Sequence, residues 1–253
     1  MLTAVVIAKN EAADLAVCLS SLKFCDEILV IDDLSTDQTA RVAKKFHARV
    51  IKHPLADDFA QQRNFGLKHS RHPWVLFVDA DEEVNPHLAA EIKAAVSQKQ
   101  FQGFYLPRVD AMWGQILKHG DAGTVKLLRL GQKNIGAWQG QVHETWQIKG
   151  PTAVLNHPLI HRPHPTLADF LRSLNYYSSL RAQELAKQQV SVFFPSLIFY
   201  PLAKFFYLWI SKLGFLDGTA GFIHAMSMAF YTFLVRGKLY LLKHHLSDSL
   251  IRP

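Results

Sequence analysis

The sequence has little cysteine and lacks the glycine-rich loops that often cradle phosphate groups. Its two cysteines, Cys18 and Cys25, form neither a disulfide framework nor a metal-ligand pattern, and they favour a reducing compartment. No strand-like run is followed by Gly-x-Gly-x-x-Gly, and no Gly-x-x-x-x-Gly-Lys-Ser/Thr occurs anywhere. The usual dinucleotide fingerprint and the P-loop are therefore excluded.

The N-terminus lacks a basic segment and a long apolar run, so no signal peptide is predicted and the protein is expected not to be exported. Acidic residues are scarce in the C-terminal part of the chain. Residues 151–253 carry 10 Lys and Arg against 4 Asp and Glu, whereas residues 1–150 carry 18 against 17. The basic residues of the C-terminal part stand beside apolar and aromatic runs, which favours an anionic membrane surface as partner. The nearly neutral N-terminal part argues against nucleic acid.

Short apolar runs and helical patterns alternate at the start of the chain. Strand-like runs at 3–8, 27–31, 49–51 and 74–78 are separated by three helical patterns, which end at residues 22, 46 and 69. This alternation predicts an α/β fold with a parallel sheet and helices on both faces. Ligands are expected at the carboxyl ends of the strands, where three polar segments fall: Lys9-Asn10-Glu11, Asp32-Asp33 and Asp79 to Asp81.

The segment from Trp74 to Val84 concentrates negative charge at the end of a buried strand. Its apolar run stops in four carboxylates, those of Asp79, Asp81, Glu82 and Glu83. Because close carboxylates repel one another, this pattern favours a bound cation or ligand, with Asp79 and Asp81 as ligands of Mg²⁺ or Mn²⁺. The alternative is a solvated turn that opens a helix.

Four segments resemble, in order and spacing, the inverting family 2 glycosyltransferases with a GT-A fold. They are Ala4–Glu11, Asp26–Asp37, Gln62–Gly66 and Phe77–Asp81. Gly140–Glu144 and Leu216–Phe222 are similar to segments of the branch that contains the lipopolysaccharide-core β-1,4-glucosyltransferases. The resemblance implies a Rossmann-like, mixed, mostly parallel sheet flanked by helices. Residues 1–165 would form the nucleotide-sugar-binding and catalytic domain, and residues 166–253 a helical, membrane-associated region.

The resemblance also implies roles for individual residues. Asp33 would read the uracil of a UDP-sugar, although a helix N-cap is the alternative for this side chain. Arg63 would face the diphosphate, or would pair as a surface arginine with Asp57 or Asp58. Asp79 would hold the ribose or a metal-bound water, and Asp81 would bind the metal directly. The wall of the nucleotide-sugar site would consist of Ala8, Lys9, Asn10 and Glu11.

An inverting displacement needs a base that takes the proton from the attacking hydroxyl. By the resemblance this base is Glu144, within the segment Gly140-Gln-Val-His-Glu. His143 would orient it or touch the metal, and His161 is a weaker candidate for either role. Three tryptophans are candidates for stacking on sugar rings, with core packing as the alternative: Trp113, Trp138 and Trp146.

The last third of the chain is predicted to be helical. Residues 167–189 have the spacing of an amphipathic helix, and Val192–Leu213 is apolar and aromatic but interrupted by Pro195 and Pro201. Gly218–Val235 has no Lys, Arg, Asp or Glu, yet its 18 residues are at the low limit for a membrane span. Interfacial helices are favoured here, and a transmembrane helix or a soluble helical cap are the alternatives.

Together these features predict a peripheral enzyme at the cytoplasmic face of the bacterial inner membrane. It would transfer a hexose, expected to be glucose from UDP-glucose, to a lipid-linked saccharide such as the inner-core heptose of lipopolysaccharide. One alternative is a polyprenyl-phosphate glycosyltransferase, whose phosphate acceptor needs little base catalysis. Another is a non-catalytic nucleotide-sugar-binding scaffold at the membrane, which would have no need of clustered carboxylates.

Overall fold

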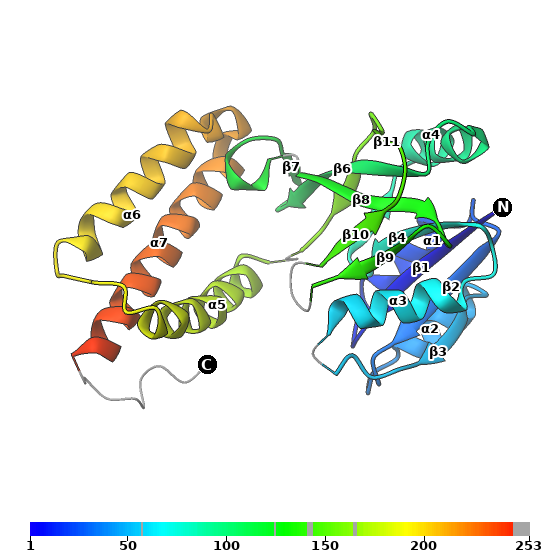
Figure 1. The fold of residues 1–253 in the computed structure, drawn as a ribbon. Coiled ribbons are helices and arrows are strands. Elements are labelled where there is room, and N and C mark those ends of the chain that lie inside the picture. The colour runs from blue at the N-terminus through cyan, green and yellow to red at the C-terminus, as the bar shows by residue number, and fades with distance from the viewer. Residues whose placement is uncertain (57, 124, 141–143, 164–165, 245–253) are drawn as a thin grey trace. The chain divides into compact units, whose positions relative to one another are not determined.

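The fold is that of a computed structural model, which describes residues 1–56, 58–123, 125–140, 144–163 and 166–244 (Figure 1). Its contacts group the chain into two compact units. The first comprises Met1–Val109 and Val125–His161, and the second comprises Asp110–Thr124 and Arg162–Pro253. The segment 110–124 thus belongs to the second unit although it precedes residue 165. The functional division at residue 165 stays a prediction.

Four parallel strands form the N-terminal part of the sheet. They lie in the order β3-β2-β1-β4, as expected from the β-α alternation. The chain crosses from β1 to β2 and β3 on one side and returns to place β4 on the other. The strands are β1 (Leu2–Ala8), β2 (Glu27–Asp32), β3 (Arg49–Lys52) and β4 (Trp74–Asp79).

Further strands extend this sheet, mainly through antiparallel pairings, and make it mixed, whereas β11 pairs parallel with β6. The order continues from β4 through β8, β6 and β12 to β5, and β7 and β11 both pair with β6. The strands are β5 (Glu82–Val84), β6 (Gly103–Met112), β7 (Gln115–Leu117), β8 (Val125–Gln132), β11 (Thr152–Val154) and β12 (Leu159–His161). A separate antiparallel pair is formed by β9 (Gly136–Gln139) and β10 (Thr145–Ile148).

Alternate side chains of each central strand enter different cores, because successive residues of a strand point to opposite faces. In β4, Leu76 and Val78 pack in the core that includes residues of α1, α2 and α4, whereas Val75 and Phe77 pack in the core that includes residues of α3, β9 and β10. Helices therefore cover both faces, which confirms the predicted arrangement. The helices are α1 (Leu15–Ser21), α2 (Thr39–Lys45), α3 (Phe59–His69) and α4 (Pro86–Ser97).

Helix α3 approaches β1 closely at Gly66. A Cβ atom at this position would lie 2.6 Å from Cγ1 of Val5, so only glycine fits without a shift of the neighbouring side chain. This close packing fixes the helix that carries Arg63 against the centre of the sheet.

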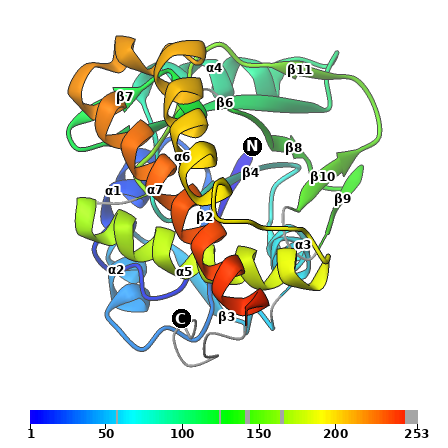
Figure 2. The ribbon, with the colours of Figure 1, turned by 90° about the vertical axis from the view of Figure 1, so that its left-hand side faces the viewer.

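The second unit consists mainly of three helices: α5 (Leu167–Lys187), α6 (Ser196–Phe206) and α7 (Gly218–Lys243) (Figure 2). The predicted amphipathic helix corresponds to α5. Pro195 stands at the start of α6, where a missing N–H costs nothing, whereas Pro201 lies inside it. Short turns of helix also occur, η1 (Gly120–Ala122), η2 (Tyr207–Ser211) and η3 (Gly214–Asp217).

Polar contacts inside the second unit tie its parts together. The Lys238 ammonium on α7 donates to the carbonyl and side-chain oxygens of Asn175 and to the hydroxyls of Ser178 and Ser179 on α5. Asp217 accepts hydrogen bonds from the backbone N–H groups of Lys118 and His119. Within the described residues, one helical stretch, Gly214–Lys243, is long and apolar enough to cross a membrane, and 39% of its apolar window is buried inside the protein.

Candidate functional site

The carboxyl ends of β2, β1 and β4 bring together the three polar segments singled out in the sequence. Ala8 is paired in register with Asp32, and Ile7 is paired with Asp79. Because the three strands are parallel neighbours, the residues that follow them meet at one edge of the sheet. The candidate site lies at this edge, within the first unit.

Asp33 is held in place by the segments on either side of it. Its Oδ2 lies 2.8 Å from Nζ of Lys9, and its Oδ1 accepts a hydrogen bond of 2.9 Å from the backbone N–H of Leu55. Burial opposes the ionisation of Asp33, but the bonds to Lys9 and Leu55 outweigh it and lower its pKa. The helix-cap alternative is not observed, since α2 begins at Thr39. Asp33 is therefore an ionised acceptor at the strand end.

The loop after β1 is tied to the loop after β2. Asn10 has a left-handed backbone conformation, with φ of 56°, and its side-chain oxygen accepts from the N–H of Thr36 at 2.9 Å. The N–H of Glu11 donates to the Thr39 hydroxyl at 2.8 Å. Burial, and then the negative charge of Asp81, raise the pKa of Glu11 to about 7. The negative charge of Asp81 is thus felt at Glu11, and carboxylates that repel one another in this way favour a bound cation.

Two arginines clamp Asp79. Nη2 of Arg129 lies 2.7 Å from Asp79 Oδ2, and Nη2 of Arg63 lies 2.9 Å from Oδ1. Burial opposes the ionisation of this carboxyl group, but the charges of Arg129 and Arg63 outweigh it and hold its pKa well below the usual range. Each oxygen of Asp79 has a further lone pair and the side chain is 30% exposed, so the clamp leaves its predicted roles toward ribose and metal open as predictions.

Sequence reasoning missed Arg129 and the role of Glu82. Arg129 lies on β8, which runs antiparallel to β4, and this pairing brings it to Asp79. Glu82 is almost fully buried and accepts a 2.8 Å hydrogen bond from the N–H of Asp79. Burial, and then the charge of Asp79, raise the pKa of Glu82. The one sequence signal was an arginine inside the apolar strand pattern Leu127-Leu-Arg-Leu130.

Arg63 also binds Glu144, through a 2.6 Å contact between Nε and Oε1. Its guanidinium lies 4.8 Å from the centre of the Trp138 ring, a cation–π arrangement. Of the two predicted surface partners, Asp58 instead caps α3 by accepting from the N–H of Gln61 at 2.8 Å, and Asp57 lies outside the described residues. Arg63 is thus a buried link between two carboxylates rather than a surface arginine.

Asp81 faces His161. The distance between Asp81 Oδ2 and His161 Nε2 is 3.2 Å, because β12 pairs with β5 and places His161 opposite Glu82. At this distance the two side chains form an ion pair if the histidine is protonated, and both carboxylate oxygen and imidazole nitrogen are ligand types for divalent metals. Among the described residues no group of three or more His, Cys, Asp or Glu side chains converges in this way. The pair would therefore leave most of the coordination to substrate oxygens and water.

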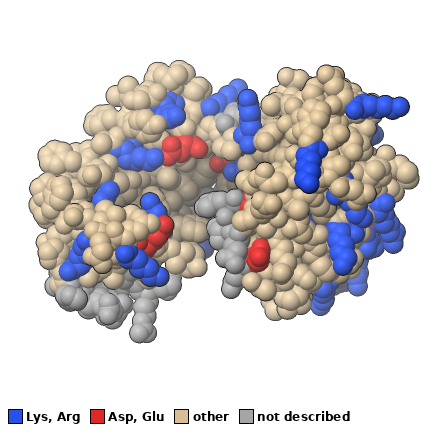
Figure 3. Space-filling view, in the orientation of Figure 1, with Lys and Arg blue, Asp and Glu red and all other residues tan. Residues whose placement is uncertain are grey.

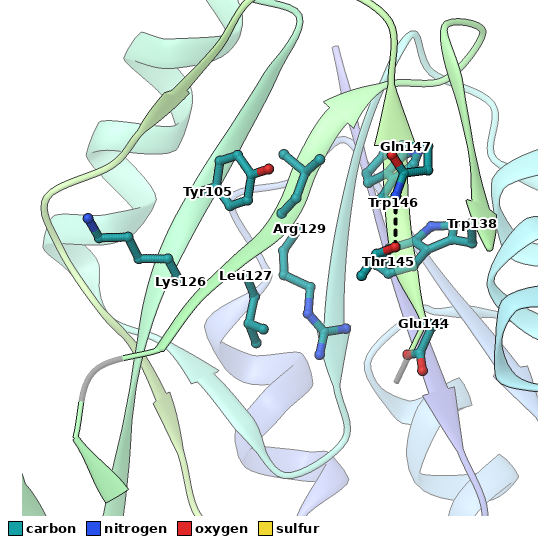
Figure 4. A pocket seen from close by; sticks show the side chains of 10 residues that line it. Tyr105, Lys126, Leu127, Arg129, Trp138, Glu144, Thr145, Trp146 and Gln147 are labelled. Carbon is teal, nitrogen blue, oxygen red and sulfur yellow. Dashed lines mark hydrogen bonds between the residues drawn. The ribbon is translucent and has the colours of Figure 1, made fainter. Parts of the chain in front are cut away.

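A pocket of about 250 Å³ opens beside Glu144 and Arg129, between β8 and β10 (Figure 4). Trp138 and Trp146 stack with a centroid distance of 5.5 Å and are 5% and 3% exposed, so core packing holds for both. His143, the predicted partner of Glu144, lies outside the described residues. The pocket is lined by Tyr105, Lys126, Leu127, Leu128, Arg129, Trp138, Glu144, Thr145, Trp146 and Gln147.

Curated relatives match nearly the whole chain. The lipopolysaccharide core biosynthesis glycosyltransferase LpsC of Rhizobium meliloti is 29% identical over 250 residues, covering 94% of this chain and 92% of the relative. An uncharacterized glycosyltransferase of Rickettsia felis is 28% identical over 252 residues, covering 94% and 89%. Among solved structures, TarS residues 1–349 from S. aureus are similar with a TM-score of 0.48 and 15% identity, covering 96% of this chain and 91% of that one.

The family model described as "Glycosyl transferase family 2" matches residues 3–143, more than half of the chain. This span includes the strands β1, β2 and β4 and the acidic segments that follow them. The predicted GT-A arrangement, a mixed and mostly parallel sheet flanked by helices, is confirmed by the observed topology. The chain belongs to glycosyl transferase family 2.

Proposed function

We propose that this glycosyltransferase moves a hexose, with glucose from UDP-glucose as the expected donor, to a lipid-linked saccharide acceptor. The observation that carries the proposal is the meeting of Asp33, the Asp81–His161 pair and the Arg63–Glu144 pair at one edge of the sheet. The similarity to a lipopolysaccharide core biosynthesis glycosyltransferase supports an inner-core saccharide as the acceptor.

The nucleotide would occupy the edge formed by β1 and β2. Asp33 is ionised and fixed by Lys9 and Leu55, so it can accept hydrogen bonds from the polar edge of uracil without further ordering. The backbone of Ala8, Lys9 and Asn10, with Glu11, would form the wall beside the base and ribose. The diphosphate would lie toward Arg63, whose fixed charge suits phosphate oxygens.

A divalent cation, Mg²⁺ or Mn²⁺, would be held by Asp81 and His161. When bound, it supplies positive charge that stabilises the charge developing on the departing UDP. Asp79, which Arg129 and Arg63 hold in its ionised state, would bind the ribose or a metal-bound water. Burial is the larger cause of the raised pKa of Glu11, and the negative charge of Asp81, which would also attract the cation, is the second.

Glu144 would act as the base toward the acceptor hydroxyl. Its contact with Arg63 keeps the carboxylate oriented, and its second oxygen is then the one to take the proton as the hydroxyl attacks the anomeric carbon. The same contact gives weight to a second candidate, a transferase that acts on a polyprenyl phosphate. Because a phosphate oxygen is already ionised, it can attack without a base. In such an enzyme Glu144 would serve only as the partner of Arg63.

The second unit would attach the enzyme to the cytoplasmic face of the inner membrane as a peripheral protein. It exposes large apolar side chains along α6, η2 and α7, including Phe199 and Ile210, and Lys204, Lys212 and Arg236 lie among them in the sequence. On the face drawn in Figure 3 this unit is largely uncharged, with Lys and Arg more frequent than Asp and Glu. Lys238, which would also meet headgroups by the sequence pattern, is instead bonded to α5.

A donor screen tests the proposal. UDP release is measured from several UDP-sugars, with and without Mn²⁺ or Mg²⁺, in the presence of extracted lipid acceptors. Turnover with UDP-glucose and a saccharide-bearing lipid is expected, and turnover only with polyprenyl phosphate would favour the second candidate. Absence of both turnover and UDP-sugar binding would leave the scaffold alternative.

A further inference from the structure

A groove of about 580 Å³ runs between α6 and α7 in the second unit. These helices lie side by side in both ribbon views (Figures 1 and 2). Every lining side chain is apolar, and Leu202, Phe206 and Phe230 are about half exposed at its walls. The lining residues are Leu197, Ile198, Pro201, Leu202, Phe205, Phe206, Met226, Ala229, Phe230 and Phe233.

We propose that this groove binds one hydrocarbon chain of an anionic lipid. The inference deepens the proposed function, on which it rests for the membrane setting. The volume falls within the range of roughly 300–1,000 Å³ in which proteins hold small ligands. A hydrocarbon chain needs no polar partner, and its binding would cover the exposed apolar walls of the groove and remove them from water.

The charges around the groove favour a lipid whose headgroup is negatively charged. Between residues 193 and 243 the chain has five basic residues and one acidic residue, Asp217. Asp217 is buried and bonded to the backbone of Lys118 and His119, whereas Asp121 pairs with Lys204, and Lys238 is bonded to α5. The basic charge that remains for a headgroup comes from Lys212, Arg236 and Lys243. A phosphate headgroup is therefore favoured, whereas a second copy of this face would bring like charges together.

Arg236 is placed to meet the headgroup. It follows the lining residue Phe233 by three positions on α7, and its guanidinium lies 4.0 Å from the centre of the Tyr200 ring on α6. A cation–π contact uses the face of the guanidinium and leaves the N–H groups in its plane directed outward. The hydrocarbon chain would thus lie along the groove with its phosphate at Arg236.

Photo-labelling of the full chain tests this inference. The protein is mixed with phosphatidylcholine vesicles that contain phosphatidylglycerol with a diazirine in its acyl chain, irradiated, and mapped by mass spectrometry. Label is expected on the groove-lining residues of 197–206 and 226–233. It should exceed the label on exposed apolar residues outside the groove, such as Phe199 and Ile210.

Ala229→Phe fills the groove while keeping the surface apolar, so it should remove most of this label without loss of vesicle binding. Ala203→Phe is the matched control, because Ala203 is exposed on α6 and does not line the groove. If Ala229→Phe fails to fold, Phe230→Ser tests the same wall at an exposed position. Arg236→Gln should reduce labelling by phosphatidylglycerol more than labelling by a diazirine-bearing phosphatidylcholine.

Uniform label over all exposed apolar residues, or label unchanged by both groove variants, would overturn the inference. So would a lipid-free dimer, seen by light scattering, that Ala229→Phe dissociates, since the occupant would then be a second copy. Labelling requires no sugar transfer. Groove-specific label without UDP release would therefore count against the proposed function alone, and turnover without groove label would count against the groove alone.

Discussion

Arg63 joins Asp79 to Glu144, with its Nη2 2.9 Å from Asp79 Oδ1 and its Nε 2.6 Å from Glu144 Oε1. The two carboxylates come from the end of β4 and from the residue before β10, which are separated by more than sixty positions in the chain. One guanidinium therefore sets the position of the proposed base relative to the edge of the sheet. Asp79 forms a second ion pair, with Arg129, whereas Glu144 is held through its ion pair with Arg63.

Arg63→Ala should destabilise the protein and impair catalysis together. Removing one partner of a fully buried ion pair costs about 3–5 kcal/mol, and a loss of about 2–3 kcal/mol is expected here because Asp79 and Glu144 are partly exposed. Urea unfolding measures the loss. Arg71→Ala is the control, because its side chain is 68% exposed and 3.6 Å from Glu27, so a change below about 1 kcal/mol is expected. Equal changes in the two variants would contradict the proposed link.

The strand ends could be predicted from the sequence, whereas the partners of their side chains could not. Apolar runs bounded by polar segments identify β1, β2 and β4, and the parallel connection rule then brings Asp33 and Asp81 to one edge. The clamp on Asp79 depends on the antiparallel pairing of β8 with β4. Register between strands fifty residues apart is set by packing of the whole core, so local pattern does not reveal Arg129.

The Asp81–His161 pair was also hidden, because His161 reaches the site through the pairing of β12 with β5 near the end of the first unit. In the sequence His161 is the weaker candidate, because an isolated histidine in a chain with 13 of them is usually structural. Conversely, the apolar character of α6 and α7 was visible in composition, but the groove between them needed the packing of the two helices. Composition therefore predicts an apolar surface in this region, whereas the groove depends on how α6 and α7 pack.

The two carboxylates of the Asp-x-Asp segment should respond differently to mutation. Asp81→Ala and His161→Ala should each abolish metal-stimulated UDP release while the melting temperature stays near that of the unmodified protein, because neither opens a core cavity. Asp79→Asn should lower the melting temperature, since it leaves the buried Arg129 without its counter-charge. Near-normal turnover of Asp81→Ala at saturating Mn²⁺ would remove Asp81 from the metal site.

Asp33→Ala should weaken donor binding far more than it slows saturated turnover. The contact to uracil is the same in the ground state and in the transition state, so its loss raises KM and leaves kcat nearly unchanged. Steady-state kinetics with varied UDP-sugar separate the two parameters. Asp26→Ala is a useful comparison, because Asp26 precedes β2 at the opposite edge of the sheet and should leave KM unaltered. A fall in kcat at constant KM would argue against nucleotide contact.

The cysteines should resist alkylation in the folded protein. Burial, and then the charge of Asp26, raise the pKa of Cys25 to about 12, and Cys18 is more deeply buried. A raised thiol pKa means that the reactive thiolate is almost absent at pH 8, so Cys25 should react roughly a thousandfold more slowly than an unperturbed cysteine. Iodoacetamide labelling at pH 8, before and after addition of urea, measures the ratio. Rapid reaction in the native state would contradict the raised pKa of Cys25 or the burial of Cys18.

Glu144→Gln should separate a saccharide acceptor from a phosphate acceptor. Glutamine keeps the shape of the side chain, and its oxygen still accepts from Nε of Arg63, so stability and donor affinity should change little. It cannot take a proton, so kcat toward a hydroxyl acceptor should fall by roughly a hundredfold or more. Glu184→Gln is the matched control, because Glu184 is also paired with an arginine, Arg181, but lies exposed on α5. If Glu144→Gln keeps most of its activity while Arg63→Ala loses it, Glu144 serves only as the partner of Arg63, and a phosphate that is ionised before it attacks becomes the better acceptor.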